Sequence, residues 1–403
     1  MRVALTDFRW PLDPALAVGR DETTLARALY ATPLRVDSAG AVVPGLCTAW
    51  KASSDFRRWT FTCRSAPSIA AALRRVTLLH DAPARWLFAQ AERISANATT
   101  LFVRLRFPWR RFPYALTVVG AAPRFVAGPF RLVSGTKRLV VARREGLTLE
   151  FRRLGAREAV REFRQGMLDE APVPLGDIAA TRADRKLGPA VRARTLLGID
   201  VVLFGPIGYR LQRAYRDTAD RGDYEELIPE LTGASAYGFL GTEKASPARF
   251  RRALDAIPSL SRRRVRVDVP SDPNLRAAAR ILYAQWRDVG LGPQLVSGPE
   301  SKPHANFLRM LAVYPQEEVI PAELVLRYEL KPRDQLLHAL GATRQRRDLE
   351  DVDEGLWVSA RAVPIAWAVD ARLVSPRLDG WREDVLGNVD YAEVRSLASS
   401  RRR

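Results

Sequence analysis

One stretch near the N-terminus, residues 46–64, restricts the fold of this chain more than any other. At positions 59–63 (WTFTC) large apolar residues and cysteine alternate with threonine, and a period of two is typical of a strand with one buried face. Residues 46–52 form a second β-type run, and the polar residues 53–57 between the two runs suit a hairpin loop. The sequence therefore predicts an antiparallel hairpin.

Both cysteines of the chain, Cys47 and Cys63, lie in this hairpin. If Ala49 pairs with Phe61, the cysteines face each other; if the two tryptophans of the hairpin pair, which buries more apolar surface, the cysteines lie on opposite faces. A β-bulge would reconcile the two registers. Because the cysteines lie on neighbouring strands, a Cys47–Cys63 disulfide is one of two open alternatives, and it would imply an oxidising compartment.

The remainder of the chain mixes strands with amphipathic helices. Residues 262–291 predict a strand, a proline-rich turn and a helix, and a further strand is expected near residues 294–296, which makes a βα unit. Helices are also expected at residues 66–93 in two pieces, and at 209–233. The pattern indicates an α/β protein.

The chain is strongly basic, with a formal net charge of +19 that comes almost entirely from arginine. Such a charge can favour nucleic acid or an anionic membrane surface. However, the arginines are spread along the whole chain and are not gathered with aromatic residues in one recognisable module, so we expect no nucleic-acid partner. No run of about 18 apolar residues occurs, so no transmembrane helix is predicted.

Sequence motifs for catalysis and metal binding are absent. The three histidines are isolated and lack the spacing of metal ligands. There is no glycine-rich phosphate loop, nucleophile elbow, HExxH or CxxC. Adjacent acids such as Glu383 and Asp384 are interpreted as solvated faces or caps. We therefore expect no enzyme, no catalytic residue, no metal and no cofactor.

Ordered positions in three parts of the chain match one family pattern. The N-terminal positions are Leu12-Asp13-Pro14-Ala15, Leu29-Tyr30, Leu34, Asp37, Gly40, Val43-Pro44, Leu46, Trp50 and Thr60-Phe61. Residues 128–132 (GPFRL) and the helix expected from residue 209 match later motifs. In these positions the chain resembles the extracytoplasmic solute-binding proteins of peptide-type (dipeptide and oligopeptide) ABC transporters, known as family 5.

This resemblance implies a two-lobed periplasmic-binding-protein-like α/β fold (type II, peptide-binding class) with a reduced insert domain. Lobe 1 would comprise residues 1–45 and 121–197, and the reduced insert subdomain with its hairpin residues 46–120. Lobe 2 would comprise residues 198–357, and residues 358–403 would return to lobe 1 and form the C-terminal tail. The chain would cross between the lobes near residues 197–205 and 357–367, as expected for a hinge.

The resemblance also implies a function. The protein would capture a peptide or similar small solute between its lobes and deliver it, as a monomer, to the permease and ATPase subunits of an ABC importer. We expect a periplasmic or cell-surface location, with a lipid anchor as one form of attachment. No apolar segment precedes Asp7, so no export signal is visible. The alternative is a cytoplasmic basic interaction or nucleic-acid-binding protein without a transport role.

Family members of this kind hold an extended ligand through backbone-type hydrogen bonds and place its amine near an acid. The matching loop here, residues 312–318 (AVYPQEE), keeps Tyr-Pro but lacks the aspartates of the family motif W-x-x-D-Y-x-D-P. Glu317 or Glu318 would take the place of that acid. The expected ligand-binding residues are Tyr30, Trp109, Tyr314, Glu317, Glu318 and Trp367.

Overall fold

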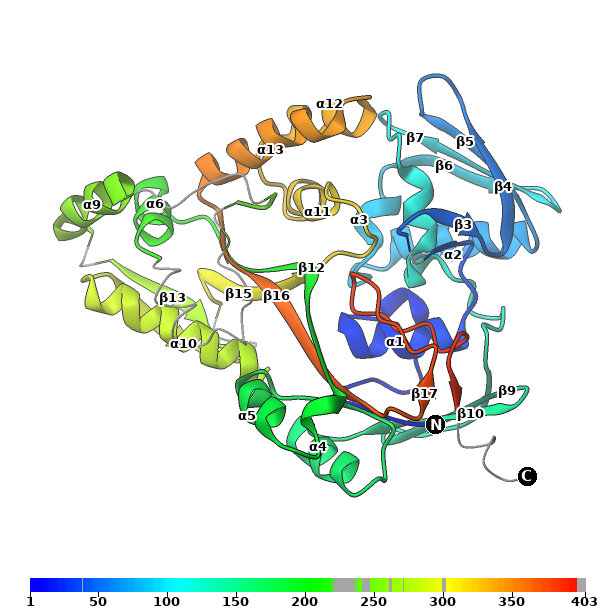
Figure 1. Ribbon diagram of the computed structural model, residues 1–403. Helices are drawn as coiled ribbons and strands as arrows, with labels where there is room; N and C mark the ends of the chain where they lie inside the picture. The colour runs from blue at the N-terminus through cyan, green and yellow to red at the C-terminus, as the bar shows by residue number, and fades with distance from the viewer. Residues whose placement is uncertain are drawn as a thin grey trace.

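A ten-stranded mixed sheet runs through the molecule and joins its two lobes (Figure 1). The computed structural model describes residues 1–37, 39–219, 236, 238–240, 247–260, 263–270, 272–298 and 302–396. The strands, in their order across the sheet, are β14 (Gly292–Val296), β13 (Arg264–Asp268), β15 (Ala305–Leu311), β12 (Val191–Phe204), β16 (Ala362–Val374), β11 (Glu170–Pro172), β1 (Arg2–Leu5), β10 (Leu147–Arg153), β9 (Leu139–Arg144) and β8 (Arg131–Gly135).

Lobe 1 is built on the β11 to β8 side of this sheet, and lobe 2 on the β15 to β14 side. The lobe 1 helices are α1 (Gly19–Leu29), α4 (Ala156–Arg164) and α5 (Ile178–Ala183). The described helices of lobe 2 are α6 (Tyr209–Asp217), α9 (Pro247–Ala256), α10 (Pro273–Asp288), α11 (Val319–Arg327), α12 (Arg333–Gly341) and α13 (Gln345–Ser359). The helix expected at residues 209–233 begins as α6, and its positions 220–233 lie outside the described residues.

Two long antiparallel strands, β12 and β16, carry the chain between the lobes. Their pairing is interrupted, because Thr195 pairs with Val369 and Ile199 pairs with Trp367, so that three residues of β12 oppose the single Ala368. Within this interruption the backbone N–H of residue 197 donates to the carbonyl of residue 385, and its carbonyl accepts from residue 312. Such a bulge disrupts the ladder and bends the strand. It lies at residues 196–198, at the start of the stretch where the sequence places a crossing between the lobes.

The insert subdomain is a separate four-stranded antiparallel sheet with two helices. In sheet order its strands are β4 (Cys47–Ala52), β5 (Arg58–Cys63), β7 (Thr100–Leu105) and β6 (Ala91–Ala96), and its helices are α2 (Ala66–Leu78) and α3 (Arg85–Phe88). The second predicted helical piece, expected to extend to residue 93, ends at Phe88. The short strand β6 follows it.

The hairpin adopts neither of the two simple registers. Trp50 pairs with Phe61, and a bulge between Cys47 and Ala49 shifts the pairing so that Cys47 lies opposite Cys63. The two cysteines form a disulfide with an S–S distance of 2.07 Å. A bulge thus allows both a large aromatic pair and facing cysteines in one hairpin.

A buried ionic cluster fastens the separate chain segments of lobe 1 to one another. The Arg372 guanidinium on β16 lies 2.8 Å from Glu170 on β11 and 3.1 Å from Asp21 on α1. Arg20 lies 2.6 Å from Glu383 near the C-terminus. Arg372 and Glu170 are almost fully buried, so these pairs lock together segments that are far apart in the sequence.

The acids Glu383 and Asp384 have different roles, and the sequence interpretation is wrong for the first. The side chain of Glu383 is only 5% exposed and is paired with Arg20, so it is not a solvated face. Asp384 does act as a cap, because its carboxylate accepts hydrogen bonds from the backbone N–H groups of Leu386 and Asn388. A pair of acids in sequence does not reveal which of the two faces a distant arginine.

A continuous apolar core joins the insert subdomain to helices α11–α13 of lobe 2. In Figure 1 helix α11 lies beside α3, and one end of α12 lies near β7. Helix α11 was not expected from the sequence, although it is buried along nearly its whole length. None of the helices in the described ranges is long and apolar enough to cross a membrane.

Candidate ligand-binding site

Three of the six expected ligand-binding residues, Tyr314, Glu317 and Glu318, lie at the junction between the insert subdomain and lobe 2. A loop after β7, residues 106–111, runs beside the C-terminal end of α12. The backbone N–H of Arg110 donates to the carbonyl of Leu340 over 2.8 Å. The ring of Tyr114 stacks on that of Tyr314, with 5.6 Å between the centroids. The hydroxyl of Tyr114 donates to the carbonyl of Gly40 over 2.9 Å. Residues of the insert subdomain (Tyr114), lobe 1 (Gly40) and lobe 2 (Tyr314) therefore meet here.

A buried ion pair fixes this junction. The guanidinium of Arg111, in the insert subdomain, donates to Oε2 of Glu318, at the start of α11, over 2.9 Å. The Glu318 side chain is fully buried, while that of Arg111 is 34% exposed. Burial raises the pKa of Glu318 above its usual value, and the positive charge of Arg111 opposes the shift. Glu318 Oε1 has no hydrogen-bond partner among the described residues.

Tyr314 lies in the same buried layer. Its ring is fully buried, and burial together with the nearby Glu318 carboxylate raises the pKa of its hydroxyl well above the ordinary value. Within the described part of the chain this hydroxyl has no hydrogen-bond partner. Tyr314 and Glu318 therefore form the floor of the junction.

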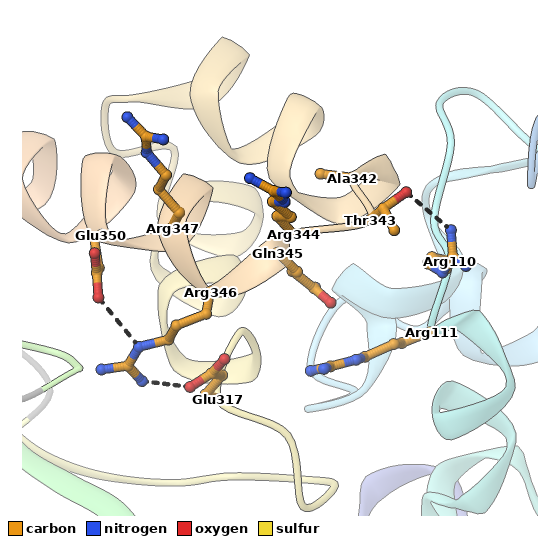
Figure 2. Close-up of a pocket in the computed structure, with 10 residues that line it drawn as sticks. All are labelled: Arg110, Arg111, Glu317, Ala342, Thr343, Arg344, Gln345, Arg346, Arg347 and Glu350. Carbon is orange, nitrogen blue, oxygen red and sulfur yellow. Dashed lines mark hydrogen bonds and ion pairs between the residues drawn. The ribbon is translucent and has the colours of Figure 1, made fainter.

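A pocket of about 660 Å³ lies at the same junction (Figure 2). Arg110 and Arg111 line it from the insert subdomain, and Glu317 lines it from the residues before α11. The other lining residues belong to the α12–α13 turn and the first turns of α13: Ala342, Thr343, Arg344, Gln345, Arg346, Arg347 and Glu350. Its lining contains five arginines and two glutamates, so the pocket is strongly positive.

Both glutamates of the pocket are engaged by one arginine. The Arg346 guanidinium pairs with the Glu317 carboxylate and lies 3.4 Å from Glu350 (Figure 2). Glu317 is therefore at the pocket, as expected from the sequence, but its charge is offset by Arg346. Among the described residues, no group of three or more His, Cys, Asp and Glu side chains could hold a metal ion.

The other sequence-predicted residues lie elsewhere. Trp109 is fully buried in the insert subdomain, where it packs against the rings of Trp86, Phe107 and Phe112 with centroids 6.0–6.2 Å apart. It is a core residue in this structure and lines no pocket described here, because its ring is enclosed on all sides by apolar groups.

Tyr30 and Trp367 lie in lobe 1 and in the hinge. The Tyr30 side chain is partly buried, and its hydroxyl donates to the carbonyl of Leu12 over 2.9 Å. Trp367 is partly buried on β16, where it pairs with Ile199 at the edge of the hinge bulge. Of the sequence-predicted residues, Glu317 lines the pocket. Tyr314 and Glu318 lie buried at the same junction without lining the pocket. The other three predicted residues lie elsewhere.

The pocket arginines did not stand out in the sequence, where arginine is abundant throughout. The signal that was present is local: Arg110-Arg111 and the run from Arg344 to Arg347 (RQRR) are short basic clusters. They are separated by more than two hundred positions, and only the fold places Arg110 next to Thr343, 3.5 Å away. Composition alone could not distinguish these arginines from solvated ones.

Comparison with known proteins was made at the level of sequence and of structure. No protein-family profile matches the chain. A curated relative, the periplasmic murein peptide-binding protein MppA of Escherichia coli K12, is 47% identical over 53 residues. This match spans 13% of the chain and 10% of the length of that protein.

Solved structures match almost the whole chain. Haemophilus influenzae OppA in complex with RPPGFSPFR has a TM-score of 0.82 at 15% identity, covering 98% of this chain and 99% of that one. The E. coli murein tripeptide binding protein MppA also has a TM-score of 0.82, at 16% identity and 98% coverage of both chains. The Pseudoalteromonas dipeptide binding protein in complex with Met-Leu has a TM-score of 0.81 at 12% identity, covering 98% of this chain and 100% of that one. The expected two-lobed α/β fold is confirmed.

The relative placement of the lobes can also be compared. A structure of MppA in its unliganded open form has a TM-score of 0.69 at 17% identity, covering 98% of this chain and 97% of that one. The value is lower than the 0.82 reached with the other MppA structure.

Proposed function

We propose that this chain is the solute-binding component of an ABC importer and that it captures a peptide or similar small solute between its lobes. One observation carries the proposal. The chain shares its two-lobed fold, over 98% of its length, with proteins described as peptide-binding. A two-lobed protein of this fold suits capture of a ligand between the lobes and its release.

Capture would follow from a difference in affinity between the two arrangements. A ligand shifts the equilibrium toward closure only to the extent that it binds the closed form more tightly than the open form. It must therefore contact both sides of the junction. The bulge at residues 196–198 gives β12 a point at which the lobes can rotate without unfolding the sheet.

Location and partners follow from the same proposal. The Cys47–Cys63 disulfide suits an oxidising compartment outside the cytoplasmic membrane, in the periplasm or at the cell surface. There the closed protein would dock, as a monomer, on the permease of an importer driven by its ATPase subunits. The protein would not itself be an enzyme.

The test is ligand-induced closure. Small-angle scattering would be measured with and without a pool of short peptides, alongside a thermal shift assay with the same pool. We expect a smaller radius of gyration and a higher melting temperature with the pool. Absence of both changes with every peptide and solute pool would refute the proposal, and salt-sensitive retention on DNA under those conditions would favour the nucleic-acid alternative.

A further inference from the structure

The pocket at the junction has more positive charge than the protein neutralises. Of its five arginines, Arg346 is paired with Glu317 and Glu350, and Arg111 is paired with Glu318. The remaining three have no carboxylate partner in the part of the chain that the structure describes; they are Arg110, Arg344 and Arg347. Guanidinium groups match carboxylates in shape and in hydrogen-bonding geometry, so this surplus favours a ligand with that chemistry.

Gln345 gives the independent evidence that the pocket is built to receive a ligand. The residue is only 5% exposed, and its side-chain nitrogen Nε2 has no hydrogen-bond partner among the described residues. Figure 2 shows this side chain extending from the start of α13 into the space between Glu317 and Arg111. Burying an amide without a partner is unfavourable. Nε2 is itself enclosed, so the amide has to turn toward the pocket before a ligand oxygen accepts this hydrogen bond.

The start of α13 adds to this preference. The helix is 15 residues long and begins at Gln345, and the residue before it, Arg344, makes no side-chain cap. The first backbone N–H groups of a helix lack partners within the helix, and they carry a partial positive charge. The unpartnered amide, the uncapped helix start and the unpaired arginines therefore all favour a negatively charged ligand group.

We propose that this pocket binds the carboxylate groups of an acidic peptide, which deepens and rests on the proposed importer function by naming its ligand class. The carboxylate would lie between Arg110 of the insert subdomain and Arg344 and Gln345 of lobe 2. The cations on both sides of the pocket repel one another. An anionic ligand removes that repulsion when it binds between them.

Matched peptides and matched variants test the proposal. Binding of tri-glutamate and of its neutral counterpart tri-glutamine would be measured by calorimetry at low and at moderate salt, with citrate, inorganic phosphate and single-stranded DNA as further probes. The pocket variant is R344Q/R347Q. Its control is R251Q/R252Q, which makes the same charge change at exposed positions of α9 that do not line the pocket.

We expect tri-glutamate to bind at least about tenfold more tightly than tri-glutamine, because each charge-assisted hydrogen bond outweighs a neutral one. R344Q/R347Q should lose most of this preference, and R251Q/R252Q should keep it. The preference should weaken with added salt. A further variant, Q345M, should melt at a higher temperature without ligand, since it removes the unpartnered amide, and should bind tri-glutamate more weakly.

The outcomes separate this inference from the proposed function. Equal binding of both peptides with normal compaction would overturn the pocket assignment while the importer function stands. Tri-glutamate binding that R344Q/R347Q abolishes, but without compaction, would support the pocket and count against the importer. If citrate binds as tightly as tri-glutamate, the pocket recognises carboxylates, but its ligand is a small polycarboxylate and not a peptide. Phosphate or DNA bound more tightly than tri-glutamate would overturn the proposal.

Discussion

Replacing Arg111 by methionine gives the strongest test of the buried junction. The substitution keeps most of the apolar stem but removes the cation that faces Glu318. The Glu318 carboxylate has its partner 2.9 Å away in the native protein and is fully enclosed. In R111M it would stay buried with no positive charge beside it, and burial already raises its pKa. The variant must then protonate Glu318, admit water or separate the insert subdomain from α11.

The expected cost follows from the geometry. Removing one partner of a fully buried pair typically costs about 3–5 kcal/mol. Because Arg111 is itself a third exposed, water can reach part of the vacated space, and we expect about 2–3 kcal/mol, at or below the lower end of that range. E318Q should cost less than about 1 kcal/mol, because the arginine left behind is already partly solvated. R111M should therefore lose more stability than E318Q, and the double variant R111M/E318Q should be more stable than R111M.

The pH dependence of R111M gives a second readout. A carboxyl whose folded-state pKa lies above its unfolded value destabilises the protein at high pH, and this destabilisation disappears as the pH falls below the unfolded value. The deficit of R111M relative to wild type should therefore be full at pH 7 and much smaller near pH 4. Urea denaturation at both pH values measures it, with R164M, which breaks an exposed pair with Asp184, as the control. A deficit below about 1 kcal/mol at pH 7, or one that does not change with pH, would refute the reasoning.

Three further predictions concern other parts of the fold. C47S/C63S should lower the free energy of unfolding by about 3 kcal/mol, because the disulfide closes a loop with a sequence separation of 16, and a reductant should do the same to the native protein in a thermal melt. Burial raises the pKa of Glu170 and of Glu383 to about 7. The free energy of unfolding, measured by urea denaturation, should therefore increase as the pH is lowered from 8 to 6. E170Q should remove roughly half of this pH dependence. G198A should destabilise by about 1–3 kcal/mol in thermal denaturation, since an added Cβ would lie 2.7 Å from Leu311 and 2.8 Å from the Met310 carbonyl; a melting temperature equal to wild type would contradict it.

Local periodicity and ordered motifs predicted much of the fold. The hairpin at residues 46–64, the helix α2 and the βα unit of β13 and α10 each have a pattern within a single segment, so a window of about ten residues contains the information. The two-lobed arrangement could be predicted only because motifs spread along the chain matched one family in order. Helix α11 was missed because nearly all of its residues are buried, so it has no polar face to mark a helical period.

The candidate site could be predicted only in part, because its chemistry depends on contacts across the junction. The sequence placed Glu317 and Glu318 in a ligand loop, and the structure places both at the junction. It could not reveal that Arg111, 207 positions away, would pair with Glu318. Trp109 differs from its expected role in another way. It was expected to contact a ligand, but the surrounding aromatic rings bury it completely.

The polarity of the junction follows from these contacts. In the family that the chain resembles, an acid in this loop would accept the amine of a peptide. Here Glu317 and Glu318 are the candidates for that acid, and each faces an arginine: Glu318 is paired with Arg111, and Glu317 with Arg346. No carboxylate of the pocket is left without a cation, whereas three of its arginines have no carboxylate partner among the described residues. An arriving amine would therefore find its counter-ions occupied, while an arriving carboxylate would find unpaired guanidinium groups and the free amide of Gln345. Under the proposed assignment, a few arginines in two short runs change the charge of the ligand group that the same scaffold recognises.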